Sequence, residues 1–186
     1  MSTLHVENLK GLSSGGNANK IIVPSGQTLD ASNGFVAPAG HVIQMQSAQL
    51  QGSSGQSSST SYVDTGLSIN ITPKFATSKI LVFTNQSVGA TKNSSTSNAR
   101  IDMKLFETGS GTVIADGRYL GTDHQEANNF SVYHNQHGVF QCSNTNQLTF
   151  KSQVRPANGS ANAASAVFYN WYTGTDHNIL ALEIAQ

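Results

Sequence analysis

The amino-acid sequence predicts an all-β protein: an antiparallel β-sandwich or jelly roll preceded by an extended N-terminal arm. Three observations predict this fold class. From residue 62 onward, apolar residues recur at every second position, the period of a strand with one buried face. Gly, Asn, Ser and Pro separate these runs at short intervals, as turns do. No run shows a convincing helical period of 3.6 residues.

Residues 1–46 are predicted to form the extended arm, because their apolar residues are few and widely spaced. A segment of this length and composition buries too little surface to fold alone. We therefore expect the arm to bind a partner surface, which is the rest of the chain, identical copies or another protein. Its predicted contact residues are Leu4, Val6, Leu9, Ile21, Ile22, Val23 and Leu29. Residues 47–61 are almost free of apolar side chains and are expected to be a Ser/Gly/Gln-rich linker or loop.

Residues 62–186 are predicted to form the β-sandwich domain, with about eight short strands. The expected strands cover residues 67–71, 79–84, 101–105, 112–115, 130–134, 148–154, 167–172 and 180–184. The run at 79–84 is continuously apolar, which indicates a strand buried on both faces. Residues 108–111 predict a hairpin turn. Asp64 with Gly66 indicates a turn or bulge, Asp116 with Gly117 indicates a turn, and residues 156–166 are expected to be a loop.

The composition restricts the classes of partner. The formal net charge is zero and only 11% of the residues are charged, so neither nucleic acid nor a membrane surface is expected as a partner. Ser, Thr, Asn and Gln supply about 70 residues, whereas soluble monomers usually carry many Lys and Glu. Short polar side chains lose little entropy on burial, and this favours a homo-oligomer. The single Cys142 follows an apolar stretch and is predicted to be a buried packing thiol.

We expect neither a catalytic site, a metal nor a cofactor. The sequence Gly-Thr-Asp-His occurs at residues 121–124 and 174–177, and two Asp-His pairs could in principle bind a divalent ion, but a turn is the simpler interpretation. His134 and His137 are three apart in an expected strand and should lie on opposite faces. The aromatic residues Phe168, Tyr169, Trp171 and Tyr172 are predicted to lie in the core or at a subunit interface. The alternative for them is a platform on which a glycan stacks.

One stretch resembles a segment of tailed-phage virion structural proteins, those of cyanophages especially. It runs from Tyr62 through Val-Asp-Thr-Gly-Leu-Ser-Ile-Asn-Ile-Thr to Pro73 and continues in the Ser-Lys-Ile-Leu-Val run at 78–82. Pro38-Ala-Gly-His-Val-Ile-Gln44 is similar to the entry that precedes such domains, and the resemblance covers roughly residues 36–120.

The resemblance implies a trimeric β-sandwich in a virion. It is compatible with a capsid decoration (cement) protein on the head surface, whose partners would be its own copies and the major capsid protein. It is also compatible with the head of a tail fibre or spike that binds a host surface glycan. The short N-terminal zone favours the decoration protein. A lectin-like or hydrolytic domain unrelated to virions is the third hypothesis.

Overall fold

The computed structural model describes residues 11, 13–16, 18, 20–28, 38–51, 55–92, 99–121, 129–157, 164–170 and 177–186. The chain divides into two compact units, Met1–Val36 and Ala37–Gln186. The described residues of the first unit form turns and loops, with no strand or helix among them. In the part of the chain that the structure describes, no helix is long and apolar enough to cross a membrane.

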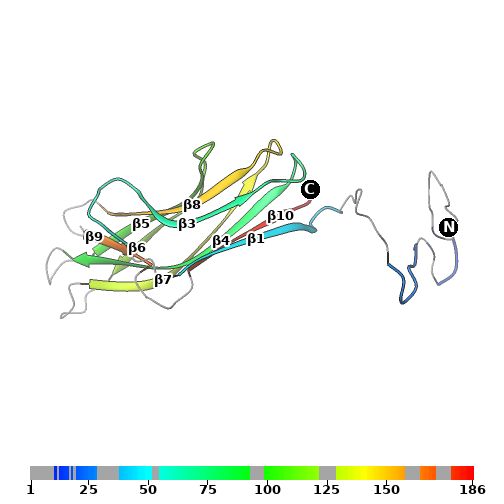
Figure 1. The fold of residues 1–186 in the computed structure, drawn as a ribbon, viewed down its shortest axis with the longest axis horizontal. Helices are drawn as coiled ribbons and strands as arrows, with labels where there is room; N and C mark the ends of the chain where they lie inside the picture. The colour runs from blue at the N-terminus through cyan, green and yellow to red at the C-terminus, as the bar shows by residue number, and fades with distance from the viewer. Residues whose placement is uncertain are drawn as a thin grey trace. The chain divides into compact units, whose positions relative to one another are not determined.

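The second unit is an antiparallel β-sandwich of ten described strands in two sheets, which confirms the predicted fold class. Figure 1 shows the two layers, with β3 and β8 in one and β1 and β10 in the other. We call the layer that contains β1 and β10 sheet A, and the layer that contains β3 and β8 sheet B. Sheet A contains β1 (Val42–Leu50), β2 (Gly55–Ser57), β4 (Lys79–Lys92), β7 (Asn129–Gln141), β9 (Ala164–Tyr169) and β10 (His177–Ile184). Sheet B contains, in spatial order, β3 (Val63–Ile71), β8 (Leu148–Pro156), β5 (Ala99–Glu107) and β6 (Val113–Gly121).

The long strand β4 organises sheet A. One of its edges pairs with β7 from Lys79 to Thr91. Its other edge pairs first with β10, from Lys79 to Asn85, and then with β9, from Val88 onward. The strand β1 continues the sheet beyond β10, and the short β2 continues it beyond β9. Four strands therefore lie side by side along the first half of β4, in the order β1, β10, β4, β7.

The core lies between the sheets and follows from the two-residue period. In β3, Leu67, Ile69 and Ile71 point inward and are at most 5% exposed. With Phe150 and other residues of both sheets they form the larger apolar cluster. A smaller cluster lies around Val88 and further residues of β4, β5, β8 and β9. Each large side chain buried in this way stabilises the fold by about 1.5–3 kcal/mol relative to leaving it exposed.

The sandwich begins earlier in the chain than the sequence predicted. The strand β1 crosses the predicted boundary between the arm (1–46) and the linker (47–61), and it pairs with β10 along its length. The strand β2 lies within the predicted linker and pairs with β9. The strands β1 and β2 are the two end strands on the path of sheet A. Backbone hydrogen bonds, which do not depend on the side chains, hold them in the sheet.

Three other local predictions are corrected. Asp116 and Gly117, expected in a turn, lie inside β6, where they pair with Lys104 and Met103 of β5. Residues 164–166, expected in a loop, begin β9. The apolar run at 79–84 is not buried on both faces, because Phe83 is 38% exposed.

Two predicted turn features are confirmed. At residues 108–110 the β5–β6 connection turns, and Glu107 accepts hydrogen bonds there from the backbone N of Gly109 (2.8 Å) and of Ser110 (2.7 Å). In β3 the register with β8 shifts between Asp64 and Ser68. Gly66 lies in this bulge at φ 85°, a conformation that favours glycine.

Candidate interaction surfaces

The structure describes part of the predicted arm contact set. Ile21, Ile22 and Val23 are 56%, 56% and 42% exposed. The described residues of their unit contain no strand against which these side chains could pack. The remaining predicted arm contacts, Leu4, Val6, Leu9 and Leu29, lie outside the described residues.

The aromatic stretch is described only in part. Tyr169 is half-buried in β9 and packs against the smaller core cluster. Its ring lies so close to Gly55 of β2 that a Cβ there would be 2.2 Å from ring atoms. Phe168 contributes its backbone to β9, while its side chain, Trp171 and Tyr172 lie outside the description.

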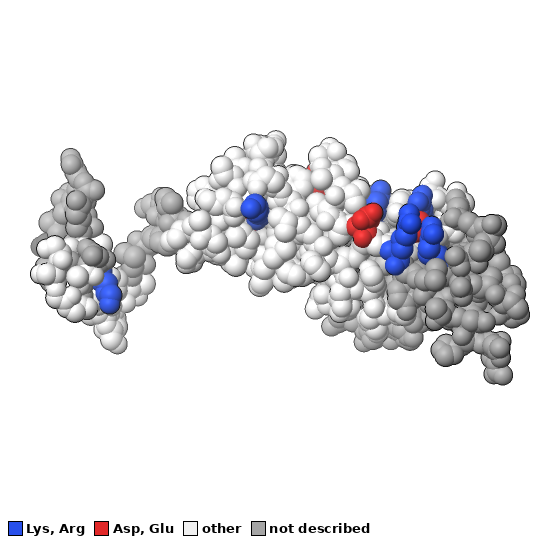
Figure 2. All heavy atoms as spheres, turned by 180° about the vertical axis from the view of Figure 1, so that it is seen from behind, with Lys and Arg blue, Asp and Glu red and all other residues white. Residues whose placement is uncertain are grey.

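The outer face of sheet B carries most of the described charges of the sandwich. Strand alternation and register place eight charged side chains of β3, β5, β6 and β8 on this one face, which we call the charged face. Its members are Asp64, Arg100, Asp102, Lys104, Asp116, Arg118, Lys151 and Arg155. Figure 2 shows several charged side chains, blue and red, gathered in one group, with a separate blue side chain further along the sandwich.

Asp102 is the centre of the charged face, and all three arginines of the chain surround it. Its Oδ1 lies 3.3 Å from Arg100 Nε and 3.7 Å from Arg118 Nε, and its Oδ2 lies 3.2 Å from Arg155 Nη2. The Asp102 side chain is only 5% exposed, whereas that of Arg118 is 74% exposed. One buried carboxylate is thus shared by three cations, so positive charge is left over for a partner.

Tyr62 extends this group at the edge of β3. Lys104 Nζ and Arg155 Cζ each lie 4.5 Å from the centroid of its ring, and Lys104 Nζ also lies 4.6 Å from the Phe106 centroid. Cations over aromatic faces attract the ring electrons and hold the rings in place. Burial raises the pKa of Tyr62, so its hydroxyl stays neutral.

Asp64 forms a second, more exposed ion pair on the charged face. Its Oδ2 lies 2.8 Å from Lys151 Nζ, and its other oxygen accepts a hydrogen bond from Gln153. Burial raises the pKa of Asp64, but the hydrogen bonds from Lys151 and Gln153 and the nearby positive charges outweigh it and hold the pKa below its ordinary value. Such exposed pairs contribute little stability, so these charges remain available for recognition.

The outer face of sheet A has the opposite character. The register places Met45, Leu182, Leu81 and Val139 side by side across β1, β10, β4 and β7. The next row, two residues further along the strands, contains Leu180 and Phe83 beside His137. We call the six residues Met45, Leu81, Phe83, Val139, Leu180 and Leu182 the apolar face. Met45 is 61% exposed and Val139 54%.

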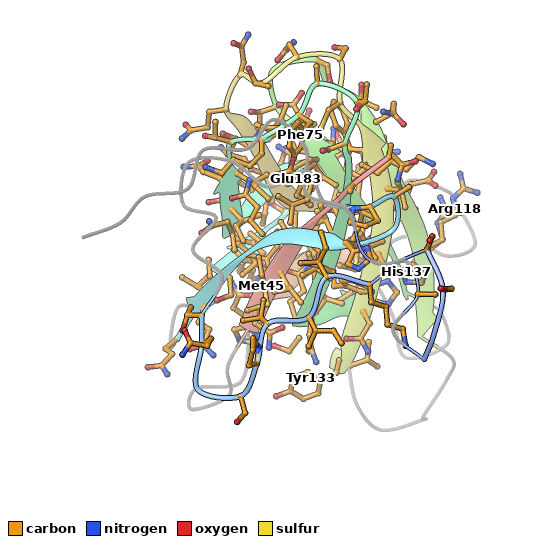
Figure 3. The ribbon with its side chains drawn as sticks, turned by 90° about the vertical axis from the view of Figure 1, so that its right-hand side faces the viewer. Met45, Phe75, Arg118, Tyr133, His137 and Glu183 are labelled. Atoms are coloured by element: carbon orange, nitrogen blue, oxygen red, sulfur yellow. The ribbon has the colours of Figure 1, made fainter. Side chains whose placement is uncertain are left out.

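The surroundings of the apolar face are uncharged, with one exception. On one side lies a row of amides, Asn178, Asn85 and Asn135, and on the other side lie Val42 and Ile184. Lys79 is the one charged residue among the described side chains that point outward from these four strands. Met45, Tyr133 and His137 lie on the same side of the sandwich in Figure 3. This face was not predicted from the sequence. The pattern that indicates it is the alternation of Leu180 and Leu182 with buried residues, which places these two leucines on the outer face of the sheet.

The two histidines of β7 lie on opposite faces, as the spacing predicts. His137 is exposed on the outer face, where its ring centroid lies 6.2 Å from that of Phe83. His134 is half-buried on the other face and lines a small pocket with Gln136 and Gly117. Burial lowers the pKa of His134.

No metal site is found among the described side chains, where no three His, Cys, Asp or Glu come together. The two Gly-Thr-Asp-His sequences lie largely outside the description. His177 of the second is buried, and its Nδ1 accepts a hydrogen bond from the backbone N of Ser87 at 3.3 Å.

Cys142 is a buried packing residue, as predicted. It is 5% exposed and belongs to the larger core cluster. Burial and then the nearby Glu183 carboxylate raise its pKa to about 11. The thiolate, which is the nucleophilic form, is therefore scarce near neutral pH.

The chain is similar to solved structures but matches no known sequence family. No protein-family model and no curated protein matches the chain. A chain from the structure of infectious bursal disease virus, Gx strain, is similar at 14% identity and a TM-score of 0.38. The match covers 77% of this chain and 33% of that one, so this chain spans about a third of its length. At this identity and TM-score the similarity to a viral structure carries no conclusion about function.

Proposed function

We propose that the chain is a non-enzymatic virion structural protein: a homotrimeric capsid decoration (cement) protein of a tailed phage that binds the major capsid protein on the head surface. The sequence resemblance supports this proposal. The resembling stretch forms β3, the turn after it and the start of β4, so it contributes an edge strand to sheet B and the first part of the strand that organises sheet A. A segment in this position is a framework of the sandwich and not a catalytic loop.

The observation that carries the proposal is the contrast between the two outer faces. The apolar face is almost uncharged, and the charged face holds eight of the described ionic side chains. A rigid sandwich with two unlike faces can hold two unlike neighbours at once. A decoration protein needs this, because it must bind its own copies and the capsid lattice together.

The proposed mechanism is mechanical. Each trimer bridges neighbouring capsomers and adds contact area that resists the pressure of packaged DNA. An interface of about 1,600 Å² in total is enough for stable and specific association. Many copies on one particle act together, so modest affinity for each site yields a durable shell.

The test uses particles stripped of their decoration protein. Purified chain is added, bound chain is measured by co-sedimentation, and survival of the particles is measured after heating. The proposal predicts binding at a fixed number of sites and restored heat resistance. It also predicts weaker binding at high salt if the charged face contacts the capsid, because salt screens exposed charges. Absence of binding at low salt would contradict the proposal.

The second candidate function is the head of a tail fibre or spike that binds a host surface glycan. The group of Tyr62, Phe106, Lys104 and Arg155 favours it, because aromatic faces beside cations suit acidic sugars. This candidate predicts that the isolated protein adsorbs to host cells and that free lipopolysaccharide blocks adsorption. Capsid binding without cell adsorption would exclude it.

A further inference from the structure

The apolar face is a large exposed surface for a sandwich of this size. It spans four strands, and its row Met45, Leu182, Leu81, Val139 runs straight across them. Contiguous apolar patches of more than a few hundred Å² on soluble proteins mark interaction sites. Eight of the described ionic residues lie on the outer face of the opposite sheet, and Lys79 is the one described charged side chain that points outward from the four strands of this face.

The size of the face fits a subunit contact. Strands about 4.8 Å apart and residues about 3.4 Å apart give an area of roughly 19 by 24 Å, or about 450 Å², between the rows of Ile184 and Asn178. A stable interface buries roughly 800 Å² on each partner. The apolar face with its rim therefore supplies more than half of the area that association needs.

The chemistry of the rim selects the partner. Asn85, Asn135 and Asn178 lie in one row, and the exposed amides of Asn135 and Asn178 each carry both a donor and an acceptor. Two identical rims can therefore hydrogen-bond to each other. Identical neutral faces also meet without repulsion between like charges, whereas a partner rich in charge would gain nothing here.

We propose that the apolar face is the surface through which copies of this chain associate. In the trimer it turns toward the symmetry axis, where Phe83 and Leu180 of each copy are covered by the neighbouring copies. This inference rests on the self-association that the proposed function includes. The inference identifies the surface that mediates this self-association, and it leaves the charged face free for the second partner.

The test compares two exposed valines on different sheets. Val139 is 54% exposed on the apolar face, and Val113 is 48% exposed on β6 of sheet B. We expect Val139→Glu to raise the dissociation constant of the assembly by about a hundredfold, because it places a charge in an apolar contact. Val113→Glu, the matched control, leaves it unchanged. Both are measured by sedimentation equilibrium, with circular dichroism as the check of folding.

A second variant guards against loss of folding. Met45→Lys changes the other end of the same row, at a residue that is 61% exposed. Dissociation of both Val139→Glu and Met45→Lys, with the control still assembled, supports the inference. A wild-type chain that is monomeric in solution would overturn the inference. The same result is expected if the arm covers this face. An assembly that tolerates both variants, or one that Val113→Glu dissociates equally, overturns it as well.

The outcomes separate this inference from the proposed function. Variants that dissociate as expected while wild-type trimers fail to bind capsids would remove the decoration role and keep the interface. Wild-type trimers that bind capsids while both variants stay assembled would keep the role and remove the interface.

Discussion

Glu183 of β10 is fully buried and connects three segments that are distant in sequence. Its carboxylate accepts hydrogen bonds from Gln44 Nε2 of β1 (2.6 Å) and from the backbone N of Lys74 (2.8 Å) and Phe75 (3.2 Å) in the turn after β3. Burial raises the pKa of Glu183, but the hydrogen bonds outweigh it and hold the pKa below the ordinary value of 4.5. This residue explains why the turn that belongs to the phage-like stretch is held in place.

We predict that Glu183→Gln lowers the free energy of unfolding by about 2 kcal/mol at pH 7, because hydrogen bonds to a charged acceptor are lost. The lowered folded-state pKa means that the carboxylate stabilises the fold above its unfolded pKa and loses this effect as pH falls through the folded pKa. The difference between wild type and variant should therefore shrink below about pH 4.5. Urea unfolding at pH 7 and pH 3 measures it, and an equal difference at both pH values would contradict the assignment.

Gly138 of β7 lies where the edge of sheet A meets β6. A Cβ at this position would be 2.3 Å from the backbone O of Ile114 and 3.0 Å from its Cβ. Gly138→Ala should therefore destabilise the protein by about 1–3 kcal/mol through overpacking. The matched control is Gly16→Ala, where nothing lies within 4 Å of the added carbon. Thermal unfolding of both variants checks this, and equal midpoints would show that the β6–β7 contact relaxes freely.

At the scale of elements, the outer face of sheet B depends on Asp102. Three arginines from β5, β6 and β8 share its carboxylate, so this residue joins three neighbouring strands by charge as well as by backbone pairing. The arginines are 25–74% exposed, and solvent weakens each single pair. The buried carboxylate has the larger effect, since its removal leaves three like charges together.

We expect Asp102→Asn to destabilise the sandwich by about 1–3 kcal/mol, the cost of leaving charged partners unsatisfied. Asp116→Asn, in the neighbouring strand of the same face, removes an exposed carboxylate and should change stability by less than about 0.5 kcal/mol. Chemical denaturation at low and high salt compares them. If Asp116→Asn lowered stability as much as Asp102→Asn, the net charge of the face and not the Asp102 site would determine stability.

The sequence period predicted the elements whose inner faces are strongly apolar. The runs around Leu67, Ile101 and Leu148 became β3, β5 and β8, because alternating residues of these strands enter the core. The strands β1 and β2 were not predicted as parts of the sandwich, because they lie at the ends of sheet A, β1 has no regular two-residue alternation of apolar residues, and β2 consists of Gly, Gln and Ser. Their position is fixed by pairing with β10 and β9, which depends on residues more than a hundred positions away.

The candidate surfaces were less predictable than the fold. The predicted contact residues were arm and aromatic residues, whereas the structure shows the apolar face of sheet A and the charged face of sheet B. Both faces arise from strand order. The row of Met45, Leu182 and Val139 combines residues that are far apart in the chain, and no local pattern brings them together. Similarly, the three arginines meet only because β6, β5 and β8 are adjacent.

At the scale of the whole molecule, the two outer faces of the sandwich differ in their chemistry. One outer surface is apolar with an amide rim, and the other is charged and built around a buried aspartate. A monomer would leave the apolar face in water at a cost that grows with its area. Covering it with identical copies removes this cost and leaves every charged face pointing away from the contact. This arrangement is the physical basis of the proposed structural role.

Sedimentation equilibrium of the wild-type chain over a range of concentrations tests this claim most directly. We predict a species with about three times the 19.6 kDa mass of the single chain, stable on dilution. A single species of 19.6 kDa at every concentration would contradict it.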